Sequence, residues 1–320
     1  MSNDVNSKDI SYFGQLAILC GLTAAGFVLM MILSVIIWFM MAGQTIPLNP
    51  SDILQPKYYN EVMVLQCVST LFLFFLPTYF FGKFCYGKPL RYLGYKNLFT
   101  VKQLILAVLI LLITFPLSGG LASFNKWIPL PMKLTNYFTK IETERASEEA
   151  LLIQISSFSK YIISLIGIAL LPAIFEETFF RAGLQKLFTN WFKGPFIAIL
   201  ITSIIFSAIH FSYYGFLVRF ALGAILGTVY YYSGSIWLNI LMHFLFNGIQ
   251  VTMLYIYNSR NTVSKPDIET GFPIWLAIAS IFILIYLFAR FIKLSDKPTL
   301  LIAKRNSDDG FENWTNNTLN

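Results

Sequence analysis

The stretch YIISLIGIALLPAIFEETFFRAG, residues 161–183, decides the fold of this chain. Its first fifteen residues are apolar enough for the interior of a bilayer, and the charged residues Glu176, Glu177 and Arg181 follow directly. A helix that spans a bilayer needs roughly 20 apolar residues. The stretch therefore predicts a transmembrane helix, and the three charged side chains within it need a physical reason.

The composition of the whole chain is that of a membrane protein. Of the 320 residues, 56% are hydrophobic and 12% are charged, and the mean hydropathy is +0.65. A soluble domain carries about twice that charged fraction. Basic cytoplasmic loops explain the net charge of +7 better than nucleic-acid binding does. We predict an all-α, polytopic membrane helical bundle in contact with the lipid bilayer and with no nucleic-acid partner.

Hydropathy divides the chain into about eight transmembrane helices. We expect them at about residues 13–42, 61–82, 103–124, 158–182, 195–213, 215–232, 235–257 and 273–292. Very short turns join the fifth, sixth and seventh. The chain then has three parts: N-terminal transmembrane helices and loops (1–150), a core that holds the polar residues (151–257), and the last transmembrane helix with a polar tail (258–320).

Loop charges predict the orientation, because Lys and Arg concentrate in cytoplasmic loops. Three basic segments fall on the same side of the membrane as the N-terminus. Their cations are Lys83, Lys88, Arg91, Lys96 and Lys102, then Lys186 and Lys193, and finally Lys293, Lys297, Lys304 and Arg305. We predict a multi-pass protein of the cell membrane with both termini in the cytoplasm. Residues 130–150, charged in both signs, are expected to form a surface loop or short interfacial helix on the outer side.

The charges near residue 176 are costly in this setting, since one charge at the bilayer centre costs about 2.5–3.5 kcal/mol. Glu177 and Arg181 are four residues apart, so they share a helix face and can pair. Glu176 lies about 100° round the helix from Glu177 and should therefore have different partners. A buried carboxyl of this kind can serve as a general acid or base.

The only two histidines of the chain lie in the same group of predicted helices. His210 is near the end of the fifth, and His243 is in the seventh. Asn239, His243 and Asn247 recur every four residues and form one polar stripe, and Phe206 precedes His210 by the same spacing. A lone membrane histidine can serve helix packing alone, but the combination favours a functional site.

Helix rise allows the depths of these groups to be compared. If the fourth helix continues to about Asn190, an antiparallel hairpin places Glu176 and His210 within roughly 5 Å in depth. The same counting places His243 one or two turns shallower, unless a kink, a tilt or a short sixth helix intervenes.

Three short motifs in this region resemble those of a known family. EETFFR (176–181) matches EExxxR, FSAIH (206–210) matches FxxxH, and HFLFN (243–247) matches HxxxN. In this order, on successive apolar helices, they resemble the CPBP family of CAAX proteases and bacteriocin-processing enzymes, also called Abi. The resemblance covers roughly residues 155–255 and makes 151–257 a CPBP-like catalytic core.

By that resemblance the chain is an intramembrane endopeptidase of CAAX-protease type, with a membrane-associated peptide or protein as substrate. Glu176 would activate a water molecule with help from His210. His243 and Asn247 would contact the carbonyl oxygen as it becomes an oxyanion. The supporting residues of the motifs would be Glu177, Arg181 and Phe206.

The site residues are compatible both with a metal cofactor and with a metal-free mechanism. A catalytic zinc usually takes three protein ligands, and Glu176, His210 and His243 could supply them to zinc or another divalent metal. The chain has no HExxH sequence, and a metal-free glutamate mechanism would use the same residues.

Two other functional classes remain as alternatives. A non-enzymatic bacteriocin-immunity or scaffold membrane protein could use the same bundle. A proton-coupled transporter would also bury such residues, but it should show an inverted repeat or broken helices in both halves, and here the polar residues lie in one half only.

Overall fold

The computed structural model describes residues 10–43, 46–47, 50–53, 55–95, 99–152, 155, 157–260 and 272–295. Every described element is a helix, which confirms the all-α membrane bundle. Within the described residues, seven helices are long and apolar enough to cross a membrane, and an eighth apolar helix, α11, is shorter. This agrees with the prediction of about eight transmembrane helices.

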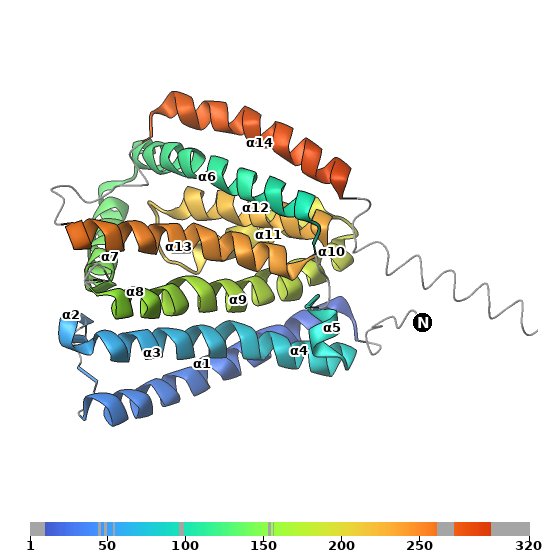
Figure 1. The fold of residues 1–320 in the computed structure, drawn as a ribbon. Coiled ribbons are helices and arrows are strands. Elements are labelled where there is room, and N and C mark those ends of the chain that lie inside the picture. The colour runs from blue at the N-terminus through green and yellow to red at the C-terminus, as the bar shows by residue number, and fades with distance from the viewer. Residues whose placement is uncertain are drawn as a thin grey trace, which may run out of the picture.

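Most of the spanning helices are regular, and two are built from several segments (Figure 1). The N-terminal elements are α1 (Tyr12–Ala42), α2 (Pro50–Ile53), η1 (Pro56–Tyr58), α3 (Tyr59–Thr70), η2 (Leu71–Phe75), α4 (Leu76–Tyr86), α5 (Pro89–Tyr92), α6 (Val101–Trp127) and α7 (Met132–Leu152). The following elements are α8 (Phe158–Ser164), η3 (Leu165–Leu170), α9 (Leu171–Glu177), η4 (Thr178–Gln185), α10 (Lys186–Phe192), α11 (Pro195–Ala208), α12 (Phe216–Ser233), α13 (Ile236–Arg260) and α14 (Ile274–Leu294).

The helix that carries the adjacent glutamates changes its winding twice. Segments α8 to α10 form one continuous span over 158–192, in which η3 and η4 are π-helical. Pro172 is the second residue of α9, two positions after the end of η3. It has no N–H for the regular helical hydrogen bond, which favours the wider turn before it. Glu176 and Glu177 are the last residues of α9, between the two π segments. Such segments are frequent at functional sites.

Helix α11 is shorter than predicted, and this moves His210 out of the membrane helices. The helix ends at Ala208, so the fifth predicted helix does not reach residue 213. Phe211 adopts a left-handed backbone with a φ of 48°, which ends the helix. Ser207 Oγ donates to the carbonyl of Phe216 at 2.6 Å and closes the turn that leads into α12.

Residues 132–152 form the 21-residue helix α7, which is longer than the loop or short helix predicted for this segment. Figure 1 shows α7 running across one end of the bundle, whereas the spanning helices run lengthwise. Its position on the outer side of the membrane stays a prediction.

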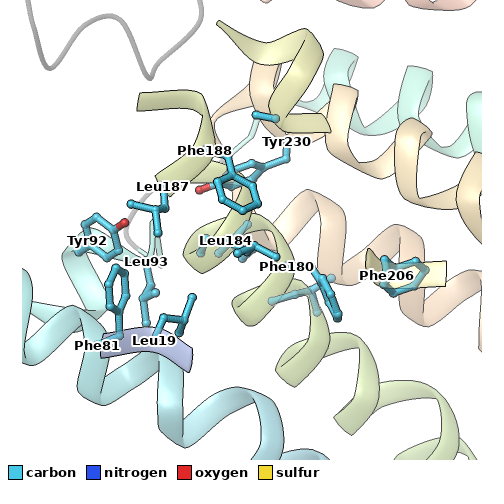
Figure 2. Packing of buried hydrophobic residues seen from close by; sticks show 14 of the residues in the cluster. Leu19, Phe81, Tyr92, Leu93, Phe180, Leu184, Leu187, Phe188, Phe206 and Tyr230 are labelled. Carbon is cyan, nitrogen blue, oxygen red and sulfur yellow. The ribbon is translucent and has the colours of Figure 1, made fainter. Parts of the chain in front are cut away.

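Two buried apolar clusters hold the bundle together. One joins α1, α4 and α5 to η4, α10 and α11, and Figure 2 shows Phe180 of η4 beside Phe206 of α11, their rings 5.1 Å apart. The other joins α6, α12, α13 and α14. Because α12 and α13 contribute to both clusters, the polar stripe of α13 lies where the clusters meet.

Candidate active site

Glu177 is the central hydrogen-bond acceptor of the site and is fully buried. Arg181 Nε donates to its Oε2 at 2.9 Å, so the predicted pair is present. Asn239 Nδ2 donates to the same oxygen at 3.2 Å. His243 Nδ1 lies 3.0 Å from the other oxygen, Oε1. One carboxylate thus connects its own helix to α13.

His243 lies between the two adjacent glutamates. As the carboxylate partner of Arg181, Glu177 can only accept, so His243 Nδ1 carries the hydrogen. The other ring nitrogen, Nε2, lies 4.0 Å from Glu176 Oε2. The prediction that Glu176 has different partners from Glu177 therefore holds only in part, because His243 lies beside both. The two carboxylates do point in different directions, but an imidazole has nitrogens on opposite edges and meets both.

The depth counted for His243 from the helix ends is also corrected. Counting placed it one or two turns from Glu176, whereas the two side chains lie 4.0 Å apart. Asn239, close to the start of α13 at Ile236, already contacts Glu177. Helix α13 therefore begins at the level of Glu177, after an α12 of only 18 residues.

Phe206, the first residue of the FSAIH motif, lies against residues of the other two motifs. Its ring centroid is 5.2 Å from that of His210 and 6.1 Å from that of His243. The guanidinium of Arg181 lies 5.5 Å from the same ring centroid, a cation–π geometry. The Phe206 ring thus contacts a residue from each of the three motifs.

His210 is oriented by a backbone contact. Its Nδ1 lies 2.7 Å from the carbonyl oxygen of Phe206. Because a carbonyl only accepts, Nδ1 carries the hydrogen, and Nε2 of the neutral ring keeps its lone pair. This is the form in which a histidine can accept a proton.

Asn247 is placed by helix register. It follows His243 by four residues on α13 and is half-buried. Residues four apart lie on the same face of a helix, so its amide faces the same way as the His243 ring.

Comparison with protein families agrees with this constellation. Residues 158–249 match the family model described as type II CAAX prenyl endopeptidase Rce1-like. The similarity to this family thus covers less than a third of the chain. The match contains all three motifs and confirms the resemblance to the CPBP family. No curated protein and no solved structure gives a match. At family level, the match and the apolar helices support a multi-pass membrane protease whose substrate is a peptide or protein.

The described part of the site does not gather the donor set of a catalytic zinc. Among the residues that the structure describes, no three His, Cys, Asp or Glu side chains are grouped so that they could hold one metal ion. The donors Glu176, His210 and His243 therefore do not fit a three-ligand site as they stand. We derive no step through a metal, and dependence on zinc or another divalent ion stays a prediction for chelation to test.

Two residues that lie at the site were assigned no role from the sequence. Asn239 belonged to the polar stripe without an assigned role, yet it bonds Glu177 and the carbonyl of Leu226, the latter at 2.7 Å. Arg219 of α12 is close enough to Glu176 for a charge–charge interaction. It is the only charged residue between positions 194 and 259. That isolation in apolar sequence was the signal that could have found it.

Proposed function

We propose that residues 151–257 are the catalytic core of an intramembrane endopeptidase of CAAX-protease type. The reaction is hydrolysis of a peptide bond in a membrane-associated substrate. The supporting observation is the imidazole of His243 between two buried carboxylates, with Glu176 Oε2 4.0 Å from Nε2. This separation is too long for a direct hydrogen bond and suits a bridging water molecule.

In this mechanism Glu176 is the general base. It takes a proton from the water molecule while the water oxygen attacks the carbonyl carbon of the scissile peptide bond. His210 assists by accepting a proton at Nε2, while its Nδ1–H stays bonded to the Phe206 carbonyl. The proton then passes from Glu176 to the leaving amine as the C–N bond breaks, so the products are a carboxylate and a free amine.

The developing negative charge needs donors on the other side of the carbonyl. His243 supplies one when both ring nitrogens are protonated: Nδ1–H stays bonded to Glu177, and Nε2–H donates to the oxyanion. The Asn247 amide supplies a second from the same face of α13. Glu177 compensates the imidazolium charge and is itself held by Arg181 and Asn239.

The experiment is cleavage by the purified protein in lipid nanodiscs. The substrates are a library of membrane-anchored peptides, including peptides that end three residues after a prenylated cysteine, and mass spectrometry identifies the products. Asn247→Ala should lower the rate about 10²–10³-fold, the effect of removing one oxyanion donor. An inactive wild-type protein would contradict the proposal and favour an immunity or scaffold role.

A chelator arm of the same experiment tests the metal. Unchanged cleavage in the chelator supports the glutamate mechanism. Loss of cleavage that zinc restores would keep the same residues and reassign Glu176, His210 and His243 as metal ligands.

A further inference from the structure

His210 lies in a turn that is held by its flanking helices and also by helices distant in sequence. We name residues 209–215, between α11 and α12, the His210 turn. Phe211, directly after the histidine, has a φ of 48°, which is unusual for a bulky residue. Such a conformation persists only where the surroundings hold it. The direction of the His210 ring therefore depends on what packs against this turn as well as on the contact between its Nδ1 and the Phe206 carbonyl.

The charged helix α7 supplies two of the contacts that hold the turn. Ser212 Oγ donates to Glu142 Oε1 at 2.6 Å. The ring of Phe138 stacks on that of Tyr213, with centroids 4.9 Å apart and planes 21° from parallel. The two α7 residues are four positions apart and share one helix face. This face of α7 therefore lies on the His210 turn.

Ser212 links α7 to the backbone of the turn through two hydrogen bonds. Its side chain is 5% exposed, and its Oγ also accepts from the backbone N–H of Gly215 at 3.1 Å. The hydrogen bonds thus run from Glu142 through Ser212 to the residue before α12. A separate contact comes from α6, where Asn125 Nδ2 donates to the carbonyl of Tyr213 at 2.7 Å.

We propose that α7 is a clamp on the His210 turn, with Glu142 and Phe138 as positioning residues for the reaction. The clamp holds the left-handed conformation at Phe211 and so fixes the direction of the His210 ring. The inference deepens the proposed function and rests on it for the role of His210. Helix α7 is too polar to be a membrane span. The inference assigns it a role in the reaction, which is to position His210.

The kinetic test compares variants of the purified protein in nanodiscs. Glu142→Ala and Ser212→Ala should each lower kcat about tenfold with little change in KM, because a misplaced catalytic group slows the reaction more than it weakens binding. The double variant should be no worse than Ser212→Ala alone, since Ser212→Ala already removes the hydrogen bond to Glu142. Glu142→Gln keeps an acceptor oxygen and should restore most of kcat. Asn136→Ala, at an exposed position of the same helix, is the matched control and should leave kcat unchanged.

An activity-independent measurement separates this inference from the proposed function. Hydrogen–deuterium exchange of the peptide 207–216 should rise in Glu142→Ala, in both the wild-type and Glu176→Gln backgrounds. Unchanged exchange in α14 serves as the internal control against global unfolding.

Each outcome decides between the two claims. If exchange in 207–216 stays at the wild-type level in Glu142→Ala, the clamp does not exist. If exchange rises while kcat stays unchanged, α7 holds the turn without positioning His210, and the proposal fails. If exchange rises and the wild-type protein cleaves nothing, the clamp is supported and the proposed function is overturned.

Discussion

The two carboxylate oxygens of Glu177 have separate partners. Oε2 accepts from Arg181 and Asn239, and Oε1 faces His243. A buried carboxylate with three side-chain partners is satisfied in a way that a lone charge in a membrane helix is not. At the scale of residues, the charges in the opening stretch thus have a physical reason: they orient the imidazole beside Glu176.

The pair between Glu177 and Arg181 can be tested by stability. Arg181→Met leaves a buried carboxylate without its cation and should lower the free energy of unfolding by about 3–5 kcal/mol. The double variant Glu177→Gln, Arg181→Met leaves no uncompensated charge and should be milder. Thermal unfolding of the purified proteins in detergent measures both. A double variant as unstable as the sum of the two single variants would argue against direct pairing.

At the scale of elements, hydropathy predicted which segments are helical but not the residues at which individual helices begin and end. After Pro195, the apolar run to residue 213 contains no proline or glycine that would predict the end of α11 at Ala208. The turn that contains the left-handed Phe211 contacts α6 and α7 through Tyr213, and both helices are distant in sequence, so no local pattern could reveal it. The Glu177–Arg181 pair was predictable because helix spacing alone brings the two residues together. The contacts with His243 were not, since they depend on the depth at which α13 begins.

Close packing of α6 against α14 gives a prediction about these two helices. A Cβ at Gly120 would lie 2.1 Å from the Cβ of Ala277, closer than two carbons can approach. Gly120→Ala should push the helices apart and lower the free energy of unfolding by about 1–3 kcal/mol. Gly21→Ala is the control, because a Cβ there meets nothing within 4 Å. Equal thermal stability of the two variants would contradict the close approach.

At the scale of the whole molecule, the ends of the helices are distributed as the loop charges predict. The connections after α4 and α10 lie at one end of the bundle in Figure 1, and α7 crosses the other end. Five of the predicted basic positions belong to that first end: Lys83, Lys88, Arg91, Lys186 and Lys193. Lys96 and the cations after residue 295 lie outside the described residues. The direction of the bundle across the membrane stays a prediction.

Topology reporters test this orientation. Fusions at Lys96 and Lys265, both outside the described residues, should report opposite sides of the membrane, with Lys96 cytoplasmic. Two fusions that report the same side would show that the number of transmembrane helices between them is wrong.

The central claim is that Glu176 activates the water that cleaves the peptide bond. The most direct measurement compares cleavage by the wild-type protein and by Glu176→Gln in nanodiscs, on a substrate that the wild-type protein cuts. Glutamine is nearly isosteric and removes the base without leaving a cavity. The rate should therefore fall by about 10²–10⁴ or more, while the melting temperature stays close to that of the wild-type protein. Full cleavage by the double variant Glu176→Gln, His210→Ala would contradict the account.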